Sequence, residues 1–166
     1  MSARRRLLWT DDDAPDRFEY EALVLGEEGW DVVWATSVSE AASLLSKQPF
    51  DALLLDQMLP YTGLKHGDPL WNGALLLRWL RGKEPPPFVT LDPRGELSTL
   101  RPKDENRDIP TVLVSAFHDP VVDKAMRDAS DQDRSLPLAP KPIDVGALLS
   151  YLDQGMARAE ARPAGP

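Results

Sequence analysis

Short apolar runs alternate along the chain with segments in which apolar residues recur at helical spacing. The runs predict buried strands at residues 6–10, 30–35, 51–55, 109–115 and 136–139. The amphipathic segments predict helices at residues 16–28, 73–80, 119–129 and 143–156, and a further helix through residues 41–45. Ser37 or Ser39 is expected to cap that further helix, and Pro49 to end it.

Strands that are apolar along their whole length are typical of a parallel sheet with helices on both faces. The alternation therefore predicts an α/β fold, a doubly wound five-stranded parallel sheet. The segment between the third helix and the fourth strand contains residues 88–91 and 96–100 on either side of a turn, which predicts a small hairpin. Residues 101–108 are charged and are expected to be exposed.

Composition narrows the class of protein. A chain of 166 residues that is 42% hydrophobic suits one folded domain. It has no cysteine, which excludes thiolate metal sites and cysteine nucleophiles. The net charge of −8 argues against nucleic acid as a partner. The sequence shows no apolar run of the roughly 18 residues that a membrane span needs and no signal peptide, so we expect a cytoplasmic protein with no membrane partner.

Polar residues with useful chemistry follow the predicted strands. Asp11 and Asp12 follow the first strand, Asp56 the third, Ser115 ends the fourth, and Lys141 follows the fifth. In a parallel sheet these positions meet at one edge, where sites form. Clustered carboxylates suit Mg²⁺, which prefers oxygen ligands. Asp56 is then a candidate nucleophile towards a phosphoryl group, whose oxygens a lysine and a hydroxyl can hold.

Four segments in this order resemble the receiver domain of two-component response regulators. They are RLLWTDDD, DALLLDQMLP, TVLVSAF and LAPKPID, and the resemblance covers about residues 5–155. It implies the flavodoxin-like receiver fold with insertions after the third strand and after the third helix. It also implies that Asp56 takes the phosphoryl group, that Ser115 bonds a phosphoryl oxygen, and that Lys141 pairs with the phosphoryl group.

The resemblance also implies a Mg²⁺ site. Asp12 would ligate the metal directly, Asp11 would help through water, and Asp56 and the backbone carbonyl of Met58 would complete the protein ligands. The bond between Lys141 and Pro142 is often cis in this family. Asp13 is expected to lie outside the metal shell.

The chain departs from the family pattern at several points. Leu138 stands where receivers usually carry Tyr or Phe, which puts the aromatic switch of the family in doubt. Met58 and Phe117 flank the site and are apolar, so neither can orient water, and slow self-hydrolysis of the phosphoaspartate is expected. The insertion at about residues 61–71 is a tolerated surface loop, a lid over the site or part of a partner surface. The insertion at about residues 83–108 is either decoration or a docking or dimer surface.

These features predict a receiver domain at residues 1–155 and a disordered tail at residues 156–166. The expected function is that of a stand-alone response regulator, which catalyses only its own phosphorylation and slow dephosphorylation. A sensor histidine kinase or a phosphotransfer protein would supply the phosphoryl group, and the output would be contact with a downstream protein target or a phosphorelay. A homodimer is the other assembly that such a domain allows.

Two alternatives remain open at this point. One is a pseudo-receiver, a binding module with this fold that is not phosphorylated; the insertions and Leu138 favour it, and the complete set of site residues argues against it. The other is a Mg²⁺-dependent phosphatase with an aspartyl nucleophile. Such enzymes usually have a second acid two residues after the nucleophile, where this chain has Met58.

Overall fold

The computed structural model describes residues 3–60, 71–83, 89–91, 97–117 and 119–163. Its central sheet consists of β1 (Arg5–Thr10), β2 (Trp30–Ala35), β3 (Ala52–Asp56), β6 (Thr111–Ser115) and β7 (Leu138–Pro140). All neighbouring strands are parallel, in the order β2-β1-β3-β6-β7. This is the flavodoxin-like strand order, so the predicted fold class is confirmed.

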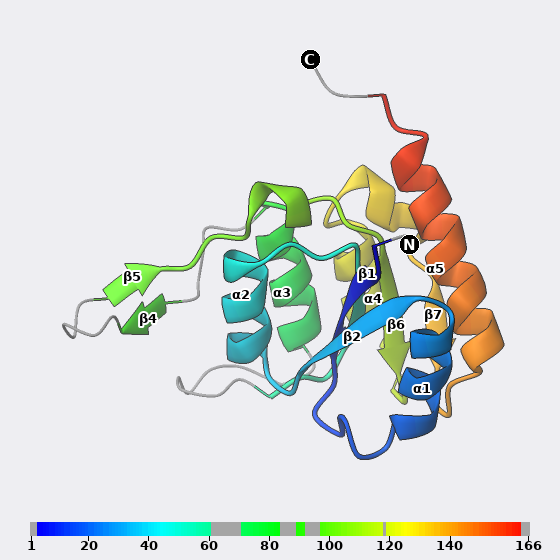
Figure 1. The fold of residues 1–166 in the computed structure, drawn as a ribbon. Coiled ribbons are helices and arrows are strands. Elements are labelled where there is room, and N and C mark those ends of the chain that lie inside the picture. The colour runs from blue at the N-terminus through cyan, green and yellow to red at the C-terminus, as the bar shows by residue number, and fades with distance from the viewer. Residues whose placement is uncertain (1–2, 61–70, 84–88, 92–96, 118, 164–166) are drawn as a thin grey trace.

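Helices cover both faces of the sheet (Figure 1). They are α1 (Glu19–Glu27), α2 (Val38–Lys47), α3 (Asn72–Leu80), α4 (Pro120–Arg127) and α5 (Val145–Glu160). Alternate residues of a strand point to opposite faces. Leu53 and Leu55 accordingly pack in the core under α2, α3 and α4, while Leu54 packs in the core under α1 and α5. Burial on both faces explains why these strands are apolar throughout.

The ends of the helices follow their capping residues. Ser37, rather than Ser39, is the N-cap of α2, and its side chain accepts a hydrogen bond from the backbone N–H of Glu40. The helix α5 continues to Glu160, beyond the predicted end at residue 156. The first part of the predicted tail is therefore helical, because its alanines, arginine and glutamate are good helix formers. Residues 164–166 lie outside the described part of the chain.

The insertion after α3 forms the predicted hairpin. β4 (Val89–Leu91) pairs with β5 (Leu97–Thr99) in antiparallel fashion, apart from the central sheet (Figure 1). The turn between them and the insertion at residues 61–70 lie outside the described residues.

The expectation that residues 101–108 are exposed is wrong for Asn106, which ends the short 3-10 helix η2 (Asp104–Asn106) and is fully buried. Its amide donates to the carbonyls of Leu45 and Gln48 and accepts from the backbone N–H of Phe50. The insertion is therefore fastened to the corner between α2 and β3. The cause is long-range hydrogen bonding, which local charge does not reveal.

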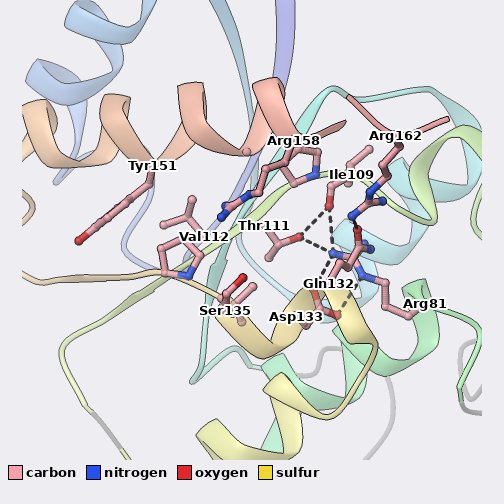
Figure 2. Close-up of a pocket in the computed structure, with 14 residues that line it drawn as sticks. Arg81, Ile109, Thr111, Val112, Gln132, Asp133, Ser135, Tyr151, Arg158 and Arg162 are labelled. Carbon is pink, nitrogen blue, oxygen red and sulfur yellow. Dashed lines mark hydrogen bonds and ion pairs between the residues drawn. The ribbon is translucent and has the colours of Figure 1, made fainter. Parts of the chain in front are cut away.

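A buried ion pair also lies at the amino edge of the sheet, beside the start of β6 (Figure 2). Arg81 follows α3, and Asp133 lies in the 3-10 helix η3 (Asp131–Ser135); each side chain is 1% exposed, and the shortest nitrogen–oxygen distance is 3.0 Å. Arg81 also donates to the carbonyls of Arg107 and Ile109. Asp133 therefore supplies the negative charge that a buried arginine needs. No helix in the described part of the chain is long and apolar enough to cross a membrane.

Candidate functional site

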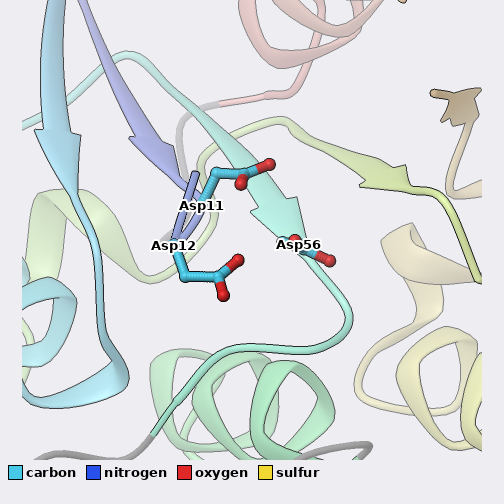
Figure 3. Close-up of side chains that lie close together, drawn as sticks. All are labelled: Asp11, Asp12 and Asp56. Atoms are coloured by element: carbon cyan, nitrogen blue, oxygen red, sulfur yellow. The ribbon is translucent and has the colours of Figure 1, made fainter. Parts of the chain in front are cut away.

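The register of β1 and β3 brings two acids together. Thr10 is paired with Leu55 across the two parallel strands, so the next residues, Asp11 and Asp56, leave the sheet side by side at its carboxyl edge. Both are buried: Asp11 is 0% exposed and Asp56 is 4% exposed. Asp12 is exposed and approaches from the same loop as Asp11 (Figure 3).

Three carboxylates at this edge could hold a metal ion. One oxygen from each of Asp11, Asp12 and Asp56 lies within 4.8 Å of the other two. Oδ2 of Asp11 is buried without a well-directed hydrogen bond and is met by the ammonium of Lys141. Repulsion among buried carboxylates and the all-oxygen donor set both suit a hard divalent cation such as Mg²⁺. The residues present therefore fit the metal that the sequence predicted.

Lys141 supplies the positive charge of the site. Its Nζ lies 2.6 Å from Oδ2 of Asp11 and 3.0 Å from Oδ2 of Asp56. Its backbone N–H donates to the carbonyl of Ser115, and the peptide bond to Pro142 is cis, as expected. Burial alone would lower the pKa of Lys141, but contact with the two carboxylates raises it above the ordinary value of 10.5. The ammonium is therefore charged at neutral pH.

Asp56 is buried and is still largely ionised at neutral pH. Burial raises its pKa from the ordinary 3.8 to about 6, against the opposing effects of Lys141 and of the Met58 N–H. That N–H donates to Oδ1 at 3.0 Å, while Lys141 contacts Oδ2. Both oxygens are thus held in place, which is what the predicted role of this carboxylate as a nucleophile requires.

Ser115 lies at the same edge, since its neighbour Val114 is paired with Asp56. Its side chain is engaged within its own loop: Oγ donates a short hydrogen bond to the carbonyl of Phe117 and accepts from the Phe117 N–H at 3.2 Å. Its predicted bond to a phosphoryl oxygen stays a prediction. The N–H of Met58 donates to Asp56, and Met58 is 40% exposed. The role of its carbonyl as a metal ligand also stays a prediction.

Two residues that support the loop after Asp56 were missed as site residues. The side chain of Asn72 donates to the carbonyl of Leu59 at 2.6 Å, and the N–H of Gly73 donates to the carbonyl of Gln57 at 3.2 Å. A Cβ atom on Gly73 would lie 2.5 Å from the carbonyl oxygen of Asp56. The sequence predicted only that a helix begins at residue 73; the close approach of the two backbones needs the glycine.

A third missed residue lies beside Lys141. The ring of Phe18 is 6% exposed, and its centroid is 5.6 Å from Nζ of Lys141. Phe18 precedes α1 in a segment for which the sequence predicted only a helix. No local signal connects it with a lysine more than a hundred positions away.

Comparison with known proteins gives a result for structure only. No family model matches the sequence, and no curated protein matches it. Many solved structures match. A putative response regulator from Chloroflexus aurantiacus is 24% identical, with a TM-score of 0.62 and coverage of 93% of this chain and 99% of that one. A CheY-like response regulator receiver domain protein from Methanospirillum hungatei is 18% identical, with a TM-score of 0.65 and coverage of 95% and 97%.

A response regulator from Burkholderia pseudomallei, solved with a phosphorylated aspartic acid, a calcium ion and citrate, is also similar. It is 16% identical, with a TM-score of 0.60 and coverage of 95% of this chain and 71% of that one. At these identities the likeness establishes the fold. The chain has the fold of response-regulator receiver domains over most of its length, with an acid cluster and a lysine at the carboxyl edge of the sheet.

Proposed function

We propose that this chain is a phosphorylation switch in which Asp56 accepts a phosphoryl group in a Mg²⁺-dependent reaction. The observation that carries the proposal is the convergence of Asp11, Asp56 and Lys141, with the ammonium within 3.0 Å of both carboxylates. The fold supports it, since a similar structure, the Burkholderia regulator, holds a phosphorylated aspartic acid and a calcium ion.

The chemical step is a displacement at phosphorus. A carboxylate oxygen of Asp56 forms a bond to the phosphorus of an activated donor, the bond to the leaving group breaks, and the leaving group departs with the electron pair. The product is an acyl phosphate on Asp56. Lys141 pairs with the phosphoryl oxygens, and Ser115 turns its hydroxyl from Phe117 towards them.

The metal would be held by Asp11, Asp12, Asp56 and the backbone carbonyl of Met58. When bound, Mg²⁺ supplies positive charge that neutralises the phosphoryl oxygens. The strands β1 and β3 already hold Asp11 and Asp56 side by side at the edge of the sheet, so metal binding would require little movement of the backbone.

The donor would be a sensor histidine kinase or a phosphotransfer protein in the cytoplasm, and the output would be protein–protein contact or relay of the phosphoryl group. A net charge of −8 makes nucleic acid an unfavourable partner. The domain that carries this activity would span residues 1–155, with insertions at about 61–71 and 83–108.

Intact-mass spectrometry after incubation with acetyl phosphate tests the proposal. We expect one added phosphoryl group on the wild type with Mg²⁺, none after chelation of Mg²⁺, and none on Asp56→Ala. Asp13→Asn is the matched control, because Asp13 belongs to the same acidic loop and pairs with Arg17 rather than Lys141. An adduct on Asp56→Ala would refute Asp56 as acceptor. No adduct on the wild type would favour the pseudo-receiver, a binding module.

A further inference from the structure

The ammonium of Lys141 has a third neighbour besides its two carboxylates. The ring of Phe18 lies 5.6 Å from Nζ, within the range over which the negative face of an aromatic ring attracts a cation. The lysine side chain is 15% exposed and Phe18 is 6% exposed, so water screens this contact little. Lys141 is thus enclosed by Asp11, Asp56 and one aromatic ring.

The ring of Phe18 is itself held in place. Its centroid lies 4.8 Å from that of Trp9, and Trp9 lies 4.9 Å from Trp34. Trp9 is fully buried in β1, two residues before Asp11. Trp34, Trp9 and Phe18 therefore form a row of aromatic side chains on the face of the sheet that α1 and α5 cover. The row ends beside the lysine and leaves Phe18 little freedom to turn away.

We propose that Phe18 is a positioning residue that keeps the ammonium of Lys141 at the phosphoryl site. This inference rests on the proposed function. Asp11 and Asp56 hold Lys141 now, but both carboxylates must turn to other partners when a cation and a phosphoryl group arrive. The ring of Phe18 is a neighbour that no such partner takes away, so it holds the ammonium through the reaction.

The chain offers a matched control for the same chemistry elsewhere. Arg6 lies over the ring of Phe50 at 5.1 Å, and Phe50 is 4% exposed. Phe50 precedes β3, at the end of that strand opposite Asp56. Phe50→Leu therefore removes a buried ring under a cation without touching the site, and Phe18→Leu and Phe18→Met remove the ring beside Lys141 while keeping an apolar side chain.

The first measurement is independent of phosphorylation. In NMR spectra of the metal-free protein, the ring current of Phe18 is expected to shift the signals of the Lys141 side-chain protons. Phe18→Leu and Phe18→Met should remove that shift, while Phe18→Tyr and Phe50→Leu should keep it. Lys141 signals that are unchanged in both Phe18→Leu and Phe18→Met would overturn the inference, whatever the protein does with acetyl phosphate.

The second measurement is the rate of phosphorylation by acetyl phosphate at saturating Mg²⁺. We expect Phe18→Leu and Phe18→Met to be slower by about five- to tenfold, the range of a partly buried cation–π contact, and Phe18→Tyr to restore most of the rate. Phe50→Leu should react like the wild type. Rates of Phe18→Leu and Phe50→Leu that fall equally would mean a general packing effect and refute positioning. A wild type that gains no phosphoryl group would refute the proposed function, and the NMR result would still decide the contact.

Discussion

Nζ of Lys141 lies 3.0 Å from Oδ2 of Asp56, although 85 positions separate the two residues in the sequence. The same nitrogen lies 2.6 Å from Asp11. One cation therefore serves two buried carboxylates, and neither acid can lose it without exposing the repulsion between them. This dependence leads to predictions that do not require the biological donor.

Replacing Lys141 by Met should destabilise the metal-free protein. The change leaves two buried carboxylates without their cation, and we expect a loss of about 2 kcal/mol in the free energy of unfolding at pH 7. Urea unfolding in a chelator measures it. Lys124→Met is the control, because that lysine is exposed and pairs with Asp128 one turn away. Equal losses in the two variants would contradict a special role for Lys141.

Asp56→Asn should stabilise the metal-free protein, and more so at higher pH. The folded-state pKa of Asp56, about 6, lies above the ordinary 3.8, so the folded state binds more protons than the unfolded state between these values. The contribution of the Asp56 carboxyl to the stability of the fold is present below about pH 4 and is lost as the pH rises to about 6. Lys141 titrates above 10.5 and lies outside this window.

The free energy of unfolding of Asp56→Asn should therefore exceed that of the wild type by on the order of 2 kcal/mol at pH 7, and by much less near pH 4. Urea unfolding of both proteins at the two pH values measures the gap, and the difference between proteins cancels the titration of other groups. A gap that is the same at both values would show that burial does not raise the pKa of Asp56.

Adding Mg²⁺ should raise the melting temperature of the wild type, because a ligand that binds only the folded state stabilises it. Asp12→Asn should lower the affinity for Mg²⁺ by about tenfold or more, as expected for loss of a metal ligand. Its stability should change little when Mg²⁺ is absent. Asp12 is exposed, so its loss costs the apo fold little. Asp13→Asn should bind Mg²⁺ like the wild type; a comparable loss there would indicate general charge attraction.

Gly73→Ala should disturb the loop after Asp56. The added Cβ would lie 2.5 Å from the carbonyl oxygen of Asp56 and 2.9 Å from Cα of Gln57, so backbone must move. We expect a loss of about 2 kcal/mol in unfolding free energy and slower phosphorylation. Gly26→Ala in α1 is the control, since nothing lies within 4 Å of its Cβ position, and it should stabilise by up to about 1 kcal/mol. A neutral Gly73→Ala would disprove the contact.

The phosphoaspartate should hydrolyse slowly without a phosphatase. Met58 is 40% exposed and Phe117 is 48% exposed; both flank the site and are apolar, so neither can direct water at phosphorus. Met58→Asn introduces a polar group and should shorten the half-life. Loss of the added mass with time after removal of the donor measures it. A half-life of minutes or less in the wild type would count against this explanation.

The sequence was sufficient to predict the sheet and the side chains that meet at its carboxyl edge. Apolar runs such as 51–55 predict buried parallel strands, and polar residues that follow such strands meet at one edge by the geometry of the fold. Asp11, Asp12, Asp56, Ser115 and Lys141 follow from that rule together with the family resemblance. Periodicity and strand ends are local properties, which a sequence displays directly.

Only the tertiary structure decided how those residues are held. The ion pair of Arg81 and Asp133, the buried amide of Asn106 and the ring of Phe18 beside Lys141 each join segments far apart in the chain. Each contact depends on the register of the strands and on which face of a helix turns inward. Neither the register nor the orientation of a helix can be predicted from one segment alone. The sequence therefore determined which groups meet at the carboxyl edge of the sheet, while packing determined which partner each group has, because partners are chosen by three-dimensional proximity.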